Sequence, residues 1–409
     1  MKIAHVTDFY LPRLGGIEMQ VAELTGRERA AGHEVHVITS SPAAKDGPGD
    51  GSSGGAGQYL AGVPYGPDQV IRVTEDLRVQ DAIHPAAWVR GCREVREGGY
   101  DLVHAHLGVG TPLGFFVALD AAKHGIPTVV TVHSLWAWII PLFRLFDAVI
   151  GWSRQPIVWT AVSDAAARHV RRVLPDGAVV HVIPNGIDPE RWRRTRPHTE
   201  IDGEITVAAV MRLSARKRPL PLLRMVRDAQ HQLAEDGIRL RLRIAGNGPR
   251  LKAMQRFLER NDMTDSVTLH GRLTSAQVRD LHQRSDAFIA PADLESFGLA
   301  ALEARCAGLP IIAKAAGGLP EFIRHEREGL ICETDGDMTA ALVRLGRDRG
   351  LLRSIQDYNA HQYCAVIWPY TLTLLGHVYE EACGSDVTLL PPVDLSPLLQ
   401  DAVASHERA

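Results

Sequence analysis

The stretch Ala287–Glu303, AFIAPADLESFGLAALE, contains the pattern that decides the fold. It begins with a short apolar run of the kind that forms a buried strand, continues through a Pro-containing loop, and enters a helical pattern near Phe297. A strand that leads through a loop into a helix is the repeating unit of an α/β fold with a parallel sheet. The same alternation extends outward in both directions along the chain.

Short runs rich in Val and Ile alternate with helix-length segments over most of the 409 residues. The predicted strands are Ile3–Phe9, Val35–Ser40, Val70–Val73, Leu102–His106, Thr128–His133, Trp159–Ser163, Val179–Ile183, Ile205–Val210, Leu240–Ala245, Val267–His270, Ala287–Ala290 and Pro310–Ala313. The two blocks of this pattern predict two Rossmann-like α/β domains that face each other across a cleft, because ligands of such sheets bind beyond the carboxyl ends of the strands.

The turn-rich stretch Pro184–Pro189 is the expected hinge. We therefore expect residues 1–190 to form the first domain and residues 191–365 the second. The Gly/Ser/Pro-rich segment 42–58 is expected to be a mobile loop, and 384–409 a partly disordered tail.

Composition excludes several classes of protein. The formal net charge of -3 argues against a nucleic-acid-binding protein. The five cysteines are scattered and form no CxxC pair, which argues for a reducing compartment and against a zinc knuckle or a disulfide framework. The N-terminus shows no signal-peptide pattern, so a cytoplasmic location is expected.

Three loops carry the candidate chemistry. Gly15 and Gly16 precede a helix, where backbone N–H groups and the helix dipole favour a phosphate, although the pattern is not the dinucleotide-binding GxGxxG. Arg212 and Lys217 follow a strand and could stabilise a departing diphosphate. The third loop lies in the opening stretch and places a carboxylate before the helix and another inside it, Glu295 and Glu303.

Other residues leave alternatives open. The apolar stretch Leu135–Ile150 is either a buried helix with a turn or an apolar lip, containing Trp136 and Trp138, that touches a lipid or a membrane. His104 and His106 have a spacing that metal ligands use, but no carboxylate or Cys lies nearby in the sequence, so no metal site is predicted. Ser163 is interpreted as a helix N-cap.

The order of these motifs resembles glycosyltransferase family 4, a family of retaining enzymes with the GT-B fold. The motifs are Gly15-Gly16, Arg-x4-Lys at 212–217, Ala245-Gly-Asn-Gly-Pro249, Glu-Ser-Phe-Gly-x4-Glu at 295–303, and Gly317-Gly-Leu-Pro-Glu321. The resemblance covers roughly residues 2–383. It implies a C-terminal helix, at about 366–383, that crosses back to the first domain.

The resemblance also implies a role for each site residue. The donor side would comprise Gly15 and Gly16 at the diphosphate, Arg212 and Lys217 neutralising it, Gly246 and Gly248 at the base, Phe297, Gly298 and Leu299 at the helix start, Glu295 at the transferred sugar and Glu303 at the ribose diol. His133 would lie beside the donor sugar or the acceptor. On the acceptor side, His106, Trp136 and Asn185 would line the cleft.

The expected reaction moves a hexose or N-acetylhexosamine from a UDP- or GDP-linked donor to an acceptor hydroxyl with retained configuration, without a cofactor or catalytic metal. Cell-envelope glycolipid, polysaccharide or natural-product synthesis would supply the acceptor, and peripheral membrane contact is one expectation. The alternatives are a sugar-nucleotide epimerase or phosphorylase on the same fold, and a non-catalytic nucleotide-sugar-binding protein.

Overall fold

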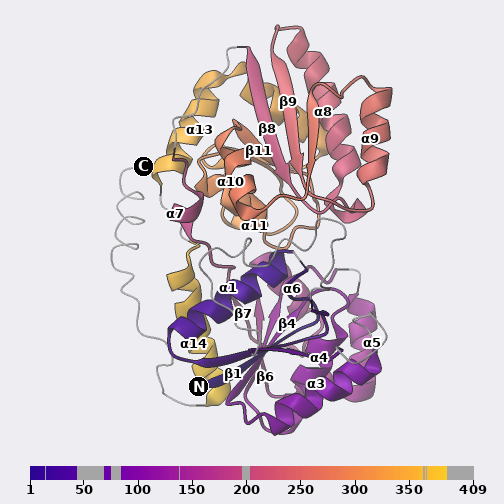
Figure 1. Cartoon of the computed structure of the whole chain (residues 1–409), viewed down its shortest axis with the longest axis vertical. Helices are drawn as coiled ribbons and strands as arrows, with labels where there is room; N and C mark the ends of the chain where they lie inside the picture. Colours follow the sequence, from indigo (N-terminus) through magenta and orange to yellow (C-terminus); the bar gives the residue numbers. More distant parts are fainter. Residues whose placement is uncertain are drawn as a thin grey trace. The chain divides into compact units, whose positions relative to one another are not determined.

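The computed structural model describes residues 1–13, 15–43, 69–74, 84–137, 139–195, 203–362, 364 and 366–384. The chain divides into two compact units (Figure 1). Unit 1 comprises Met1–Gly186 together with the chain from Trp368 onward, and unit 2 is Ile187–Ile367. The predicted mobile segment falls mostly, and the predicted tail almost wholly, outside the described residues.

Unit 1 contains a seven-stranded parallel sheet in the order β3-β2-β1-β4-β5-β6-β7. Its strands are β1 (Lys2–Thr7), β2 (Glu34–Thr39), β3 (Val70–Arg72), β4 (Leu102–Leu107), β5 (Thr128–Val132), β6 (Ile157–Ala161) and β7 (Val180–Val182). Its helices are α1 (Gly16–Ala30), α3 (Pro85–Glu97), α4 (Pro112–Lys123), α5 (Ile140–Ile150), α6 (Asp164–Arg171) and α14 (Trp368–Cys383).

Unit 2 contains a six-stranded parallel sheet in the order β10-β9-β8-β11-β12-β13. Its strands are β8 (Glu204–Val210), β9 (Arg239–Ala245), β10 (Val267–Gly271), β11 (Ala287–Ala290), β12 (Ile311–Lys314) and β13 (Gly329–Cys332). Its helices are α7 (Pro189–Trp192), α8 (Pro219–Ala234), α9 (Leu251–Arg260), α10 (Ser275–Gln283), α11 (Leu299–Cys306), α12 (Asp335–Arg347) and α13 (Arg349–His361).

The prediction of two Rossmann-like α/β domains is confirmed. Each sheet is parallel, and strands such as β4 and β5 are buried along their length because helices cover both faces, whereas β9 and β10, at one edge of their sheet, alternate between buried and more exposed residues. All six residues of β4, for example, are buried. Strand β13 was not predicted: it has only four residues, begins with a glycine and follows a run of charged residues.

Local chemistry sets the helix boundaries. The Ser163 hydroxyl accepts the Ala166 N–H at 3.1 Å, so the predicted N-cap of α6 is confirmed. Thr274 and Thr334 begin α10 and α12 with reciprocal capping boxes. Strand β1 ends two residues before the predicted Phe9, because the buried Asp8 carboxylate leaves the sheet and accepts the N–H groups of Leu113 and Gly114 at the start of α4.

Candidate functional site

The carboxyl ends of the strands in unit 2 bring together two of the predicted catalytic residues. Lys217 lies in a short 3₁₀ turn after β8, and Glu295 lies in the loop after β11. Lys217 Nζ is 2.5 Å from Glu295 Oε2, and both side chains are only partly exposed. The sequence separates this pair by 78 residues, and adjacent strands of the sheet bring it together. Arg212, from the same loop as Lys217, is exposed.

The loop that carries Glu295 is fixed by glycines. Gly317 has a φ of +141°, and a Cβ there would lie 2.4 Å from the Glu295 carbonyl oxygen, so only glycine permits this approach. The Gly318 N–H donates to the same oxygen at 2.9 Å. Gly298 has a φ of +95° and precedes the first turn of α11. The backbone of this loop is thus set before any ligand arrives.

Helix α11 begins where the sequence predicted a phosphate-facing helix N-terminus. Leu299 is its first residue and Glu303 its fifth, so Glu303 lies just beyond the first turn and is half-buried. Phe297 is buried and packs against Phe322, with ring centroids 5.4 Å apart. Phe297 therefore shapes the loop through packing, and its side chain belongs to the protein interior.

Gly246 and Gly248 allow two loops to lie side by side. A Cβ on Gly246 would lie 1.8 Å from the Met211 carbonyl oxygen, and one on Gly248 would lie 2.6 Å from the Leu213 carbonyl oxygen. The Leu213 N–H donates to the Asn247 carbonyl at 3.0 Å. These glycines place the 246–248 loop against the loop that carries Arg212 and Lys217.

A cluster of charged residues that sequence reasoning missed supports the Lys217–Glu295 loops. Arg218 is adjacent to Lys217 and makes two hydrogen bonds to Asp335, at 2.8 and 2.9 Å, while its Nε lies 3.0 Å from Asp293. Lys314, which is buried, also contacts Asp335 at 2.8 Å. The hydrogen bond from Arg218 is the main reason why the pKa of Asp335 falls to about 2. No local motif signals this cluster, because its members come from four separate segments of the chain: the start of α8, the loop after β11, the end of β12 and the start of α12.

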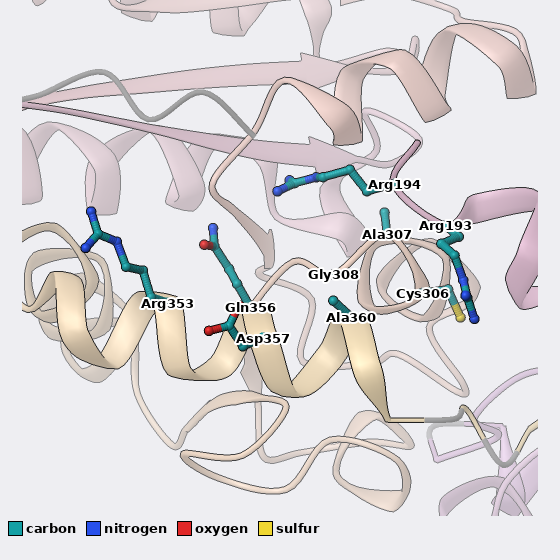
Figure 2. A pocket seen from close by; sticks show the side chains of 9 residues that line it. All are labelled: Arg193, Arg194, Cys306, Ala307, Gly308, Arg353, Gln356, Asp357 and Ala360. Atoms are coloured by element: carbon teal, nitrogen blue, oxygen red, sulfur yellow. The ribbon is translucent and has the colours of Figure 1, made fainter. Parts of the chain in front are cut away.

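Figure 2 shows one cavity of unit 2, whose lining includes none of these residues. It measures about 390 Å³ and is lined by the three arginines Arg193, Arg194 and Arg353, by the α11 C-terminus and by α13. Gly308, in its wall, precedes β12, so the cavity lies at the amino end of the sheet, opposite the candidate site.

In unit 1, the first glycine motif forms the predicted helix start. Gly15 is the N-cap of α1, and a Cβ on it would lie 2.3 Å from Glu18 Oε2. Glu18 is buried and pairs with Arg13 at 3.3 Å. A Cβ on Gly16 would meet no atom of the described structure within 4 Å. The space beside Gly16 is thus open, while the Glu18 carboxylate lies beside Gly15.

Three other predicted residues of unit 1 line one small cavity of about 30 Å³. His106 belongs to β4, His133 follows β5 and Asn185 follows β7, and Gln20 and Trp368 complete the wall from α1 and α14. His106 Nδ1 lies 3.1 Å from His133 Nε2. Burial lowers the pKa of His133 to about 4, which makes its neutral form dominant at pH 7.

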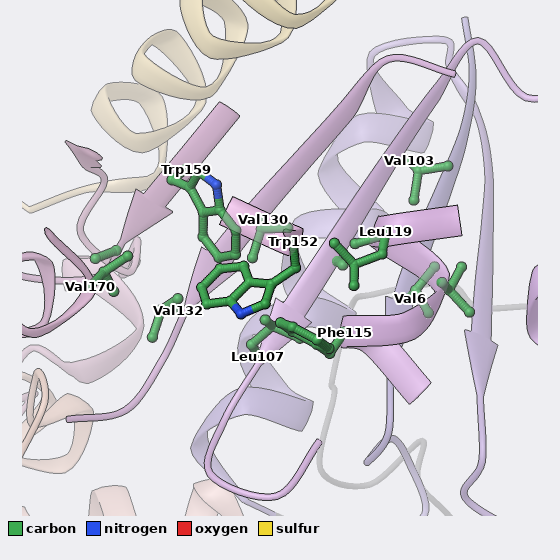
Figure 3. Packing of buried hydrophobic residues seen from close by; sticks show 14 of the residues in the cluster. Val6, Val103, Leu107, Phe115, Leu119, Val130, Val132, Trp152, Trp159 and Val170 are labelled. Atoms are coloured by element: carbon green, nitrogen blue, oxygen red, sulfur yellow. The ribbon is translucent and has the colours of Figure 1, made fainter. Parts of the chain in front are cut away.

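The prediction that Trp136 lines an acceptor-side lip is wrong. Trp136 is buried and stacks on Phe143, with ring centroids 4.5 Å apart. It belongs to the same hydrophobic core as Trp152, Trp159 and Phe115, which pack around one another (Figure 3). The apolar side chains that are exposed in this region belong to the following helix, α5, where the periodicity of the sequence places them on one face. Trp138 lies outside the described residues.

The outer face of α5 is an exposed apolar surface. Leu142, Leu145 and Val149 are spaced three and four residues apart and are 61%, 66% and 76% exposed. This spacing puts them on one side of the helix. Within the part of the chain that the structure describes, no helix is both long and apolar enough to span a membrane.

Comparisons with known proteins agree with this architecture. The family model of Glycosyltransferase Family 4 matches residues 14–191, and that of Glycosyl transferases group 1 matches residues 190–361. The chain is 25% identical to a D-inositol 3-phosphate glycosyltransferase of Streptomyces bingchenggensis, over 90% of this chain and 85% of the relative.

It is also 25% identical to the GDP-mannose-dependent alpha-(1-6)-phosphatidylinositol monomannoside mannosyltransferase of Mycobacterium tuberculosis, over 81% of this chain and 85% of the relative. Among solved structures, HepE of Anabaena in complex with UDP and glucose is similar, with a TM-score of 0.69 and 17% identity, covering 93% of this chain and 98% of HepE. The sucrose-phosphate synthase of Thermosynechococcus elongatus matches with the same TM-score, identity and coverage.

Proposed function

This chain belongs to glycosyltransferase family 4, and from that premise we propose that it transfers a hexose or N-acetylhexosamine from a UDP- or GDP-linked donor to an acceptor hydroxyl, with retention of the anomeric configuration. The observation that carries the proposal is the pairing of Lys217 with Glu295 at the carboxyl ends of β8 and β11, beside the start of α11. This arrangement provides a cation, a helix N-terminus and two carboxylates on one sheet edge.

Each group has a chemical task in this proposal. Lys217 and Arg212 stabilise the negative charge that grows on the diphosphate as its bond to the sugar breaks. The N-terminus of α11 adds a second positive field. Glu303 accepts hydrogen bonds from the ribose hydroxyls, and Glu295 contacts the transferred sugar.

The Lys217–Glu295 pair favours a front-face route, in which the leaving phosphate takes the acceptor proton. A carboxylate held by an ammonium group at 2.5 Å is a weaker nucleophile than one without such a partner, so a covalent glycosyl–Glu295 intermediate is disfavoured. The family comparisons support sugar transfer. Two relatives, a D-inositol 3-phosphate glycosyltransferase and a phosphatidylinositol monomannoside mannosyltransferase, support a polyol-phosphate or lipid-linked acceptor.

A ligand-stabilisation experiment tests the donor site. Unfolding of the wild type is followed with UDP, GDP, ADP and their sugar conjugates, and a ligand at a hundred times its Kd should add about 2.7 kcal/mol of stability. Glu303→Ala should abolish the effect of the one nucleotide family that stabilises the wild type. The control is Glu259→Ala, an exposed glutamate of α9, which should respond like the wild type.

Product analysis tests the reaction. The transferred sugar should carry the same anomeric configuration as the donor, measured by the one-bond proton coupling of the anomeric carbon. Stabilisation by no nucleotide sugar would remove the proposed donor site, and an inverted product would remove the retaining mechanism.

A further inference from the structure

A buried chain of hydrogen bonds in unit 1 connects helix α1 to the loop after β5. Glu28 Oε2 on α1 lies 2.6 Å from His5 Nε2 on β1, and His5 Nδ1 lies 2.9 Å from His106 Nε2 on β4. His106 Nδ1 then lies 3.1 Å from His133 Nε2. Glu28, His5 and His106 are each at most 2% exposed. A carboxylate in the interior is thus connected through two ring systems to a residue of the candidate site.

A second branch starts from the same carboxylate. The Tyr379 hydroxyl, on α14, donates to Glu28 Oε1 at 2.8 Å. The same hydroxyl lies 2.8 Å from His104 Nδ1, and His104 Nε2 lies 2.7 Å from the Thr131 hydroxyl. Burial lowers the pKa of the neighbouring Arg29 guanidinium, and the charges of Tyr10 and Glu28 oppose this shift. Glu28 is therefore the anionic centre from which both branches extend.

The directions of the hydrogen bonds follow from Glu28. A carboxylate only accepts, so His5 carries its proton on Nε2 and its Nδ1 is an acceptor. His106 must then donate from Nε2, which leaves its Nδ1 to accept from His133 Nε2. Burial lowers the pKa of His106 well below its usual value, so both rings at the end of the chain are neutral and each has a single tautomer. His133 Nδ1 is left without a proton.

The same histidines also have the proximity that a metal site requires. One ring nitrogen from each of His5, His104 and His106 lies within 4.8 Å of the others. However, all six of their ring nitrogens have hydrogen-bond partners at 2.6–3.1 Å. The hydrogen-bonded chain accounts for every one of these nitrogens, so we assign the cluster to the chain and to no metal.

We propose that Glu28 and His5 are positioning residues that fix, through His106, the tautomer of His133 with Nδ1 as a hydrogen-bond acceptor. One part of this proposal rests on the proposed function: a hydroxyl group of the sugar donor or of the acceptor would donate a hydrogen bond to His133 Nδ1. The role resembles that of any buried carboxylate that holds a functional histidine in one tautomer.

The chain has a second state that differs by one proton. A proton added at His133 Nδ1 allows Nε2–H to pass its proton to His106 Nδ1, and His106 Nε2–H to pass its proton to His5 Nδ1. His133 and His106 are then neutral in the opposite tautomer, and the positive charge lies on His5 beside the Glu28 carboxylate. The titratable groups that face this chain are Glu28, His5, His104, His106, His133, Tyr379 and Arg29.

The experiment measures tautomers directly. Protein labelled with ¹⁵N-histidine is studied by NMR correlation of ring nitrogens with ring carbon-bound protons, at pH 7.5 and without substrate. The His133 signals are assigned by their loss in His133→Gln. The expected wild-type pattern is a protonated Nε2 and an unprotonated Nδ1. A protonated Nδ1, or one metal ion bound per chain in elemental analysis, would overturn the proposal.

The variant Glu28→Gln tests the origin of the effect. An amide offers its NH₂ or its oxygen to His5, so His133 should lose the single tautomer and show both forms. Glu23→Gln, on the same helix but bonded to Trp368 and Arg27, should keep the wild-type pattern. If Glu28→Gln folds and the protonation pattern of the His133 ring nitrogens is unchanged, the proposal is refuted. If this variant does not fold, the wild-type spectrum alone decides whether the proposal holds.

Activity gives a separate readout. Glu28→Gln should lower kcat/KM roughly ten- to hundredfold, by analogy with the loss caused by removing the hydrogen-bond partner of a metal-bound histidine. Because the NMR measurement uses no substrate, a chain that transfers no sugar but shows the expected tautomer would contradict the proposed function and leave the tautomer assignment standing.

Discussion

The ion pair between Lys217 and Glu295 contributes little to the free energy of unfolding. Both side chains keep some contact with solvent, at 31% and 17% exposure. Partly exposed ion pairs contribute at most about 1 kcal/mol to folding. Their charges are therefore available for chemistry without being essential to the stability of unit 2.

Lys217→Met should separate catalysis from stability. Loss of the ammonium group should lower kcat by roughly 10²–10³, as for other groups that stabilise transition-state charge. The free energy of unfolding should change by about 1 kcal/mol or less. Steady-state kinetics and urea unfolding measure the two effects, with the exposed neighbour Arg216→Met as the matched control. If the loss of unfolding free energy exceeded the loss of transition-state stabilisation, Lys217 would have a structural role instead.

The amino-acid sequence predicts the site residues that lie in short motifs after strands. Lys217, Glu295, Gly298 and Glu303 belong to this class, because parallel strands place all their following loops at one edge. It does not predict residues whose partners are distant in sequence. Glu28 pairs with His5, and neither has a local pattern that distinguishes it from an ordinary helix or strand residue.

His104 and His106 also have partners that a local sequence pattern does not predict. The sequence offers no carboxylate near them, yet the fold brings Glu28 within two hydrogen bonds of His106. Side-chain partners across a sheet are set by strand order, which a single sequence does not encode in any one segment.

Helix α5 is the element for which pattern and structure differ most. Of the two alternatives for Leu135–Ile150, the apolar lip placed Trp136 at the surface, whereas that side chain is in the core and the exposed apolar residues of this segment's helix are Leu142, Leu145 and Val149. Aromatic side chains bury large apolar areas, so they fill the interior when the backbone allows it. Arg144, on the same helix, is also exposed and adds a positive charge.

The outer face of α5 should bind anionic lipid surfaces. Each leucine contributes about 1.5–3 kcal/mol when it is buried in apolar surroundings. Leu142→Ser with Leu145→Ser should therefore lower partitioning onto phosphatidylglycerol-containing vesicles by roughly tenfold or more. Co-sedimentation measures the partitioning, and Val89→Ser, an exposed apolar residue of α3, is the control. Equal partitioning of the double variant and the wild type would exclude α5 as a membrane contact.

Four histidines with lowered pKa values make the stability of the molecule sensitive to acid. Burial lowers the pKa of His133 to about 4 and of His282 to about 3, and lowers the pKa of His104 and His106 well below the usual value of 6.5. Below pH 6.5 the unfolded chain therefore binds more protons than the folded chain. The contribution of these neutral rings to the free energy of unfolding is fully present above pH 6.5. It is lost as the pH falls from 6.5 towards the pKa values that these histidines have in the folded state.

His282→Leu tests this contribution in unit 2. Between pH 7.5 and 5.5, one histidine with a strongly lowered pKa should remove about 1.4 kcal/mol from the free energy of unfolding. Urea unfolding should show a smaller loss of stability over this interval in His282→Leu than in the wild type. His231→Leu, an exposed histidine of α8, should lose as much as the wild type. The same pH dependence in all three proteins would contradict the assignment.

The return of α14 to unit 1 has a consequence for synthesis on the ribosome. Unit 2 is one continuous segment, but unit 1 receives its last helix only after all of unit 2 has been made. Until that helix emerges, Tyr379 is missing from Glu28, and the apolar residues Ile3, Leu102 and Val129 lack the cover that Leu375 and Val378 provide. The second unit can therefore be complete while part of the core of the first unit is still open. This reverses the usual N-to-C order in which domains finish folding, and it leaves apolar surface of the nascent first unit exposed to aggregation until α14 has been made.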